Sequence, residues 1–504
     1  MNRAATLVLA ILLFFLIVLA PIDPAAFPVQ ARYVAAVTVL MVSLWVTESI
    51  PLEATAFLPL ILFPLLGILS PAEAAASYAD RVIFLFLGGF IIAMSMQRWG
   101  LHRRIALNII AVVGTSPRKV ILGFMIATAF LSMWISNTAT TMMMIPIAAA
   151  IIATVIPGTN IGLENLTKAE QSLATCLIIS IPYAASIGGV ATIIGTPPNG
   201  IFLAQLETLF PAAPNIDFFT WMQFGVPFAA LFLLLAWIWL VYGPYRRMEK
   251  ELPGAKGIIR EHLNEMGRMS RGEQWTLLVF VMTALAWVFA STKEIGTFVI
   301  PGLDMIFPGI HDSTIAVFGA FLLFILPADL KKGTFVMDWE WAVKIPWGIL
   351  ILFGGGICLS EAFIRSGLAS QIVSYLTVLH GLPILIMVLL VAAVVSLAGE
   401  IASNTAMAAV MIPIMGVTAV SMGINPLILM VTAAVCSSLA FMLPVATPPN
   451  AVAYSTGYLT SRDLMRSGWV LNFAGVGLWA AALFTLVTWV LGLTLDMPAW
   501  ALTP

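Results

Sequence analysis

Two identical tetrapeptides, Ser-Asn-Thr-Ala at 136–139 and at 403–406, carry the polar side chains with the most evident chemistry. Their hydroxyl groups donate and accept hydrogen bonds, and the asparagine amide does both as well. Each lies near the middle of a long apolar stretch, where a turn would expose backbone N–H groups at the start of a second helix. Those N–H groups and the helix dipole suit an anion, whereas carbonyl groups that end the first helix suit Na⁺.

A second repeated tetrapeptide, Thr-Pro-Pro-Asn, occurs at 196–199 and at 447–450. Two consecutive prolines remove two backbone donors and clash with the preceding turn, so neither segment can continue a helix. Each tetrapeptide therefore predicts a break at mid-depth within an apolar span. Carbonyl groups that the breaks leave free near Gly195 and Ala446 can then coordinate a cation.

The composition places these motifs in a membrane. Hydrophobic residues make up 61% of the 504, charged residues only 9%, and the mean hydropathy is +1.04. A soluble domain carries roughly 25% charged residues, so a soluble enzyme, a disordered chain and a nucleic-acid binder are excluded. The formal net charge of −1 implies no surface for a polyanion. The three cysteines and four histidines show no metal-ligand spacing.

A bilayer crossing needs about 20 mostly apolar residues, and the chain contains eleven candidates. We expect crossings at 4–20, 32–49, 54–70, 81–97, 171–195, 217–243, 275–291, 312–328, 346–363, 426–446 and 467–493. Two further apolar stretches, 119–155 and 381–416, are too long for one helix and short for two spans, so we interpret both as re-entrant helical hairpins. A cleaved signal peptide is the alternative for the first crossing, but its length and single arginine favour a transmembrane helix.

The basic residues predict the orientation. With the N-terminus inside and the C-terminus outside, 19 of the 23 lysines and arginines fall on the cytoplasmic side, as the positive-inside rule requires. This agreement includes counting both hairpins as non-crossing. We interpret the polar stretch 246–271 as an amphipathic helix on the cytoplasmic surface that links two halves, with a solvated linker as the alternative.

The two halves of the chain repeat one another. Residues 85–101 read LFLGGFIIAMSMQRWGL and residues 352–368 read LFGGGICLSEAFIRSGL, an offset of 267 that also relates the two Ser-Asn-Thr-Ala tetrapeptides. In the predicted topology the first copy runs from outside to inside and the second runs the opposite way, so the repeats are inverted. Inverted repeats with interrupted helices are typical of secondary transporters, whose site lies at the repeat interface near the midplane.

No lysine or arginine lies near either Ser-Asn-Thr triplet in the sequence. A bare ion buried in the membrane would cost on the order of tens of kcal/mol in the limiting case, so co-bound cations are the expected compensation for an anion. The spacing alone therefore predicts a cation-coupled anion carrier. The alternative is that the triplets only join helices by hydrogen bonds; two triplets at matched positions beside two matched breaks favour the carrier.

These residues resemble the divalent anion:sodium symporter (DASS) family, which contains Na⁺-coupled carriers of dicarboxylates, citrate and sulfate. The resemblance covers nearly the whole chain and includes both glycine-pair segments, both repeated tetrapeptides and two further motifs. Those motifs are Trp45-Val46-Thr47-Glu48-Ser49-Ile50-Pro51 and Ser437-Ser438-Leu439-Ala440-Phe441-Met442-Leu443-Pro444-Val445-Ala446, followed by Asn450. The second signature usually ends in Val, where this chain has Ala453.

The resemblance implies an all-α polytopic homodimer in which each protomer has a scaffold domain and a transport domain that moves as an elevator. Scaffold helices would occupy 1–80 and 211–345, the latter including the 246–271 linker, with a C-terminal helix in 461–504. The transport domain would combine two segments: 81–210, with hairpin 119–155 and broken helix 171–205, and 346–460, with hairpin 381–416 and broken helix 426–456. The implied location is the bacterial inner membrane.

By the same resemblance, position by position, the substrate would be held by Ser136, Asn137, Thr138, Thr196, Pro197, Ser403, Asn404, Thr405, Thr447 and Pro448. A first sodium site would use Ser132, Ser136, Asn137 and Gly195, and a second would use Ala402, Asn404 and Ala446. Two or more Na⁺ ions would be co-transported. The implied partners are a small dianionic carboxylate, the lipid bilayer and a second copy of the chain.

One position departs from the family pattern. The family often has Thr four residues before the second Ser, where this chain has Gly399, whereas the equivalent position in the first half keeps its hydroxyl as Ser132. The second sodium site therefore lacks one expected oxygen, which water, Ser437 or Thr432 could replace. Glu400 is another candidate, because an intramembrane carboxylate is by default a functional hypothesis; the alternative is a hydrogen-bonded structural acid behind the site.

The leading functional prediction is Na⁺-coupled symport of C4-dicarboxylates such as succinate, malate or fumarate, because two complete tips can each bind one carboxylate. Gly399 motivates an alternative, a dicarboxylate exchanger of the same fold. A sulfate or citrate carrier is a third possibility, since hydroxyl and N–H donors suit any small divalent anion. An anion channel and a membrane enzyme have less support; we find no paired acids, Ser-His arrangement or metal cluster in the spans.

Overall fold

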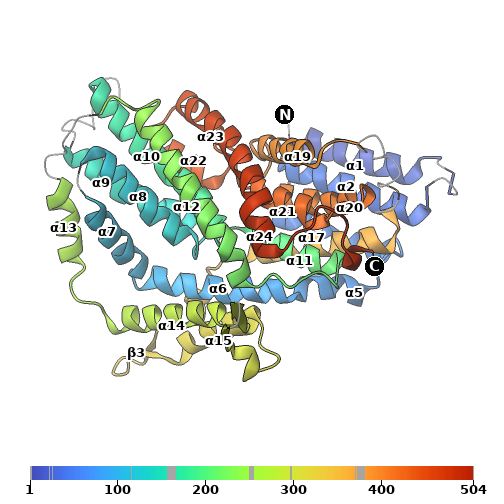
Figure 1. Cartoon of the computed structure of the whole chain (residues 1–504), viewed down its shortest axis with the longest axis horizontal. Helices are drawn as coiled ribbons and strands as arrows, with labels where there is room; N and C mark the ends of the chain where they lie inside the picture. Colours follow the sequence, from blue (N-terminus) through green and yellow to red (C-terminus); the bar gives the residue numbers. More distant parts are fainter. Residues whose placement is uncertain are drawn as a thin grey trace.

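The computed structural model describes residues 3–21, 23–24, 27–114, 116–155, 166–248, 255–295, 298–368, 371 and 381–502. Over these residues the chain is mostly helical (Figure 1), which confirms the predicted fold class of an all-α polytopic membrane protein. The strands in the described part form two short antiparallel pairs, β1 (Lys293–Ile295) with β2 (Phe298–Ile300) and β3 (Pro327–Asp329) with β4 (Thr334–Phe335).

The first half of the chain contains the helices from the N-terminus to the predicted linker. They are α1 (Arg3–Leu19), α2 (Val29–Thr47), α3 (Leu52–Thr55), α4 (Leu58–Leu65), α5 (Pro71–Ala76), η1 (Ser77–Ala79), α6 (Arg81–Arg98), α7 (Leu101–Val113), α8 (Pro117–Ser132), α9 (Asn137–Val155), α10 (Lys168–Gly189), α11 (Pro197–Leu209), α12 (Phe218–Tyr242) and α13 (Ala255–Glu265). Helix α13 lies within the predicted linker, of which residues 249–254 are outside the described residues.

The second half continues with the elements that repeat the first. They are α14 (Arg271–Val288), η4 (Leu303–Met305), α15 (Asp312–Ile325), α16 (Trp339–Ala342), α17 (Trp347–Arg365), α19 (Ile384–Gly399), α20 (Asn404–Ser421), α21 (Pro426–Cys436), α22 (Pro448–Ser455), α23 (Ser461–Ala482), the π-helical turn η6 (Leu483–Val487), α24 (Thr488–Leu491) and η7 (Ala499–Ala501).

Length and composition select eight helices of the described chain as candidate membrane spans, fewer than the eleven predicted crossings. The eight include the second helix of each hairpin, α9 and α20. Five other apolar helices or helix pairs are shorter, namely Arg3–Leu19, Leu52–Leu65, Asp312–Ile325, Ile384–Gly399 and Pro426–Cys436. The difference arises where a turn or break divides an apolar stretch, as in Leu52–Leu65 and Pro426–Cys436, and where a single helix is short, as in Arg3–Leu19 and Asp312–Ile325.

Both predicted hairpins are present, and they match residue for residue. Helices α8 and α19 begin and end 267 positions apart, and α9 and α20 begin at the same offset. The tips that join them are residues 133–136 and 400–403. Both predicted helix breaks are present as well, since α11 and α22 each begin at the first proline of a Thr-Pro-Pro-Asn tetrapeptide.

The helices pack into two groups, one around α10 and one that contains α6 and α17, and α11 packs against α17 and α20. In one group α10 is enclosed by α8, α9, α12 and α22, and almost all of it is buried. In the other, α6 packs against α14 and α15, and α17 packs against α3 and α4. Helix α12, which the sequence places in the 211–345 scaffold segment, packs instead against α8, α10 and α23, as Figure 1 shows.

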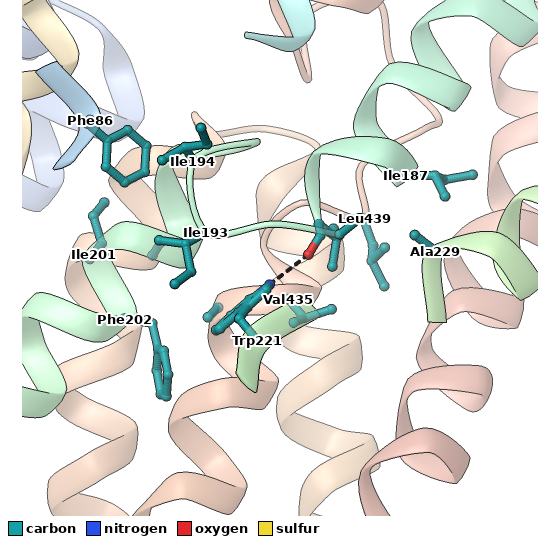
Figure 2. Close-up of a cluster of buried hydrophobic side chains, with 14 of the residues drawn as sticks. Phe86, Ile187, Ile193, Ile194, Ile201, Phe202, Trp221, Ala229, Val435 and Leu439 are labelled. Atoms are coloured by element: carbon teal, nitrogen blue, oxygen red, sulfur yellow. Dashed lines mark hydrogen bonds between the residues drawn. The ribbon is translucent and has the colours of Figure 1, made fainter. Parts of the chain in front are cut away.

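A hydrophobic cluster supports the first helix break. Figure 2 shows Ile193 of the broken segment beside Trp221 of α12 and Ile194 nearer to Phe86, with Val435 and Leu439 contributed by the second half. The indole Nε1 of Trp221 donates a hydrogen bond to the Val190 carbonyl oxygen at 2.9 Å, drawn as the dashed line. The cluster therefore both buries apolar surface and satisfies a carbonyl group that the break releases.

Candidate functional site

The tip of the first hairpin gathers oxygen atoms around Asn137. The buried Ser132 hydroxyl lies 2.6 Å from the Asn137 amide, and the carbonyl oxygens of Ala185 and Gly195 lie 3.1 and 3.3 Å from it. With its nitrogen turned inward the amide donates to these oxygens; with its oxygen turned inward it completes a set of four oxygens. Such a set of neutral oxygens suits a Na⁺ ion.

This close approach depends on Gly189. A Cβ atom at position 189 would lie 2.5 Å from the Asn137 side-chain oxygen, so any larger residue would displace the amide. Gly188 makes room in the same way, because a Cβ there would lie 2.3 Å from the Ala129 carbonyl oxygen of α8. The two glycines at the end of α10 thus let the hairpin tip sit directly against the break.

The first broken segment, residues 190–196, is held open by Asn199. Its side-chain Nδ2 donates to the carbonyl oxygens of Gly189, Val190 and Thr192, at 3.2, 3.4 and 2.8 Å. Asn199 is fully buried, so these bonds satisfy carbonyl groups that the missing helical turn would otherwise have paired. The Thr192 hydroxyl in turn donates to the Met133 carbonyl oxygen, which joins the break to the hairpin tip.

The second break uses the same device. The Asn450 Nδ2 donates to the carbonyl oxygens of Ala440 and Leu443, at 3.4 and 3.1 Å. These two residues are the counterparts of Gly189 and Thr192 at the offset of 251 that relates the two Thr-Pro-Pro-Asn tetrapeptides. The last residue of each tetrapeptide is therefore a clamp on the segment that precedes it, and sequence reasoning did not assign it that role.

The tip of the second hairpin is arranged around Asn404. Its buried side-chain Oδ1 has no hydrogen-bond partner among the residues that the structure describes. A Cβ added at Gly399 would lie 3.6 Å from that oxygen and 3.4 Å from the Ser437 carbonyl oxygen, both ordinary contact distances. Position 399 therefore has room for a Cβ atom, and that atom would border two acceptor oxygens.

Glu400 lies behind this tip and contacts the second broken segment. Its carboxylate accepts hydrogen bonds from the backbone N–H groups of Phe441, Met442 and Leu443, at 2.7 to 3.0 Å, and from the Asn472 side-chain nitrogen at 2.7 Å. Of the two interpretations of this acid, these contacts support the hydrogen-bonded structural acid behind the site. Its backbone position next to Gly399 still places it at the tip.

The residues that the sequence predicts for the substrate and sodium sites lie at, or up to two residues before, the start of a helix, except Ser132, which ends α8. Ser136, Asn137, Thr138, Ser403, Asn404 and Thr405 are partly exposed, as is Pro197; Pro448 is exposed, and Thr196, Thr447, Ala402 and Ala446 are buried. The Ser136 hydroxyl accepts from the Ala139 N–H at 3.4 Å and the Thr447 hydroxyl accepts from the Asn450 N–H at 3.3 Å. Because α9 packs against α22 and α20 packs against α11, each hairpin contacts the broken helix of the opposite half. The four helices that begin at the tips and breaks therefore form two packed pairs, α9 with α22 and α11 with α20. The unpaired N–H groups at the start of such a helix suit an anion.

Comparison with known proteins finds relatives over nearly the whole chain. Residues 1–493 match the family described as the sodium:sulfate symporter transmembrane region. The chain is 40% identical over 489 residues to the sodium-dependent dicarboxylate transporter SdcS of Staphylococcus saprophyticus, covering 96% of this chain and 92% of the relative. It is 39% identical to SdcS of Staphylococcus aureus with the same coverage.

The chain belongs to this symporter family. The resemblance to divalent anion:sodium symporters is thereby confirmed, and this DASS chain is a membrane transporter. Its helices also superpose on Neisseria gonorrhoeae MtrF, described as one of a class of antimetabolite efflux pumps, and on the Alcanivorax borkumensis YdaH transporter. The TM-scores are 0.55 and 0.56 at 12% identity, covering 84% and 92% of this chain and 84% and 99% of the respective structures. At that identity the likeness concerns the fold alone.

The buried charges of this DASS chain are sparse. Among the described residues, the buried charged side chains are Asp217, Glu273, Asp312 and Glu400, with no lysine or arginine in that set. A dianion at the tips would therefore meet helix N-termini, hydroxyl groups and amides without a cationic side chain from this set. The expectation that co-bound cations supply the compensating charge remains consistent with the structure.

Proposed function

We propose that this chain couples the inward movement of Na⁺ to the uptake of a C4-dicarboxylate such as succinate, malate or fumarate. The observation that carries the proposal is the oxygen cluster at Asn137, where Ser132, Ala185 and Gly195 converge on one amide without a charged side chain. Neutral oxygens arranged in this way suit Na⁺ better than an anion. The SdcS relatives are sodium-dependent dicarboxylate transporters, and we take the substrate class from them.

In this proposal each hairpin tip binds one carboxylate of the substrate. Hydroxyl groups and amides of the two Ser-Asn-Thr triplets would donate to the carboxylate oxygens, together with N–H groups at the starts of α9 and α20. Thr196, Pro197, Thr447 and Pro448 would line the site from the two breaks. A two-ended dianion fits a site that has two equivalent ends.

At least two Na⁺ ions would travel with the substrate. The first would use Ser132, Ser136, Asn137 and Gly195, and the second Ala402, Asn404 and Ala446. Two ions would leave the dianion neutral overall, and a third would move one positive charge, worth about 2.3 kcal/mol per 100 mV. The membrane potential would then drive uptake directly.

The transport step would be an elevator movement of the hairpins and broken helices against the scaffold, in a homodimer of the bacterial inner membrane with the N-terminus inside. The moving unit and the scaffold would follow the predicted domain ranges except at two helices. The packing supports assigning α12 to the moving unit and α6 to the scaffold. Trp134 of the first tip would then lie on the sliding surface, since its ring is 4.9 Å from Phe280 and 6.4 Å from Trp287 of α14.

Radiolabelled succinate uptake into proteoliposomes tests this function. Vesicles would be given an inward Na⁺ gradient with the interior either empty or loaded with succinate, and Asn137→Ala protein would serve as the control. Na⁺-dependent uptake into empty vesicles supports symport. Uptake only into loaded vesicles and indifferent to Na⁺ would support the exchanger that Gly399 motivates. Competent protein that transports succinate in neither case would refute both and direct the assay to sulfate and citrate.

A further inference from the structure

Glu400 is a buried carboxylate to which the transport proposal gives no role. Only 2% of the residue is exposed. Its Oε1 accepts from the Phe441 N–H and from the Asn472 side chain, its Oε2 accepts from the Leu443 N–H, and both oxygens accept from the Met442 N–H at 3.0 Å. Every one of these contacts is a donor directed at a carboxylate oxygen, as the acceptor-only ionised form requires.

Glu400, like Asp312 and unlike the two other buried acids, has no cationic partner among the ion pairs of the described residues. Glu273 pairs with Arg104 at 2.5 Å and Asp217 pairs with Lys293 at 3.0 Å. Neutral donors stabilise the Glu400 carboxylate but leave its charge uncompensated, and a buried charge without an opposite charge is costly. A cation bound at the adjacent tip would supply that compensation.

The first half of the chain joins its tip to its break without charge. At the offset of 267 the counterpart of Glu400 is Met133, whose backbone carbonyl oxygen accepts the hydrogen bond from the Thr192 hydroxyl. The counterpart of Gly399 is Ser132, whose hydroxyl lies beside the Asn137 amide. The first tip therefore has the Ser132 hydroxyl oxygen and no charged side chain, whereas the second tip has the Glu400 carboxylate and no hydroxyl at position 399.

We propose that Glu400 is a positioning residue with two effects at the second tip. It holds residues 441–443 against the hairpin, and its negative charge retains the Na⁺ ion that Asn404 and nearby carbonyl oxygens would ligate with one oxygen too few. The inference rests on the proposed Na⁺ coupling and goes beyond it, because it assigns the ion's retention to an acid that does not touch the ion.

The experiment measures the Na⁺ concentration that half-saturates succinate uptake in proteoliposomes. Glu400→Gln keeps the shape and removes the charge, and Glu400→Gln with Asn472→Asp returns a charge to the neighbouring side chain, 2.7 Å away. Glu273→Gln removes a buried acid elsewhere and is the matched control. We expect Glu400→Gln to raise the half-saturating Na⁺ concentration about tenfold or more, the double variant to restore it to within about threefold, and the control to leave it unchanged.

An unchanged half-saturating Na⁺ concentration in Glu400→Gln would overturn the inference, as would a lower maximal rate that neither more Na⁺ nor Asn472→Asp restores. If Glu400→Gln yields no folded protein, Glu400→Asp, which keeps the charge and loosens the contacts, should keep the half-saturating concentration within about threefold; a tenfold rise would count against the inference. A wild-type protein whose uptake ignores Na⁺ would instead refute the proposed function. The increase in melting temperature with NaCl over KCl, measured without substrate, would then still report whether Glu400 affects Na⁺ binding.

Discussion

Threonine at position 399 would add a hydroxyl group beside Asn404, at the place where the first half has the Ser132 hydroxyl. The site can accept the first atom of the side chain, because a Cβ there would lie 3.4 Å from the Ser437 carbonyl oxygen and 3.8 Å from the Ala440 Cβ. Position 399 is the last residue of α19 and has no left-handed backbone angle. We therefore expect Gly399→Thr to fold normally and to strengthen Na⁺ binding at the second tip.

The size of the effect follows from what the hydroxyl would replace. Exchanging a water for one protein oxygen is worth about one net hydrogen bond, about 1 kcal/mol, and 1.4 kcal/mol corresponds to tenfold in affinity. The half-saturating Na⁺ concentration should fall about fivefold, with the maximal uptake rate nearly unchanged. The steric and propensity effects of a β-branched residue are separated by Gly399→Val, which has a similar shape but no oxygen.

Succinate uptake at varied Na⁺ concentration, in the two variants and the wild type, gives the answer. We expect the half-saturating Na⁺ concentration to fall in the threonine variant and to stay unchanged in the valine variant. Equal shifts in both would assign the effect to packing or helix propensity, and no shift in either would mean that the second site is already complete from other groups. Gly189→Ala provides the opposite case, because its Cβ would meet the Asn137 side-chain oxygen at 2.5 Å and should abolish Na⁺-dependent uptake.

Three further predictions concern the site and the fold. Asn137→Ala and Asn404→Ala should each abolish uptake while each variant elutes on gel filtration at the same volume as the wild type; full transport by both would refute the assignment of these residues to the site. Asn199→Ala should lower the free energy of unfolding by at least about 2 kcal/mol, because three carbonyl oxygens lose a donor. A melting curve like that of the wild type would refute the role of Asn199 as a clamp. Burial and the neighbouring Arg81 lower the pKa of His311 to about 4. The unfolded chain therefore binds the proton first, and the stability of the fold should decrease as the pH drops from about 6.5 to 4. His311→Asn, which can still cap α15, should remove this decrease from a plot of melting temperature against pH.

The sequence predicted the elements of the site well because each is set by local rules. Consecutive prolines end a helix wherever they stand, and a polar triplet within a long apolar stretch requires a turn, so both breaks and both hairpins lie where they were expected. The number of full-length spans was less certain from the sequence, since hydropathy does not show where a turn divides an apolar stretch. Helix α12 shows a related limit: its place in the chain gives no sign that it packs against α8, α10 and α23.

The contacts that complete the site could not be predicted in the same way, because they join residues far apart in the chain. Nothing local indicates that the Asn472 side chain meets Glu400, or that the Thr192 hydroxyl meets the Met133 carbonyl oxygen. The clamps made by Asn199 and Asn450 span only ten residues or fewer and could have been found, since an asparagine after a helix break commonly pairs with freed backbone groups. Its repetition in both tetrapeptides was the available signal.

The two halves of the chain share the residues that shape the tip and the break, and they differ at a few neighbouring positions. Both halves keep the turn, the double proline and the asparagine clamp, and these residues set the backbone of the tip and the break. The halves differ at three paired positions of the tip and the break: Ser132 and Gly399, Met133 and Glu400, Thr192 and Leu443. Because the backbone device is shared, these pairs can be exchanged one at a time between the halves. If the inverted repeat determines geometry and the three pairs determine cation binding, exchanging all three should reverse which tip binds Na⁺ more tightly while leaving the binding of the dicarboxylate nearly unchanged.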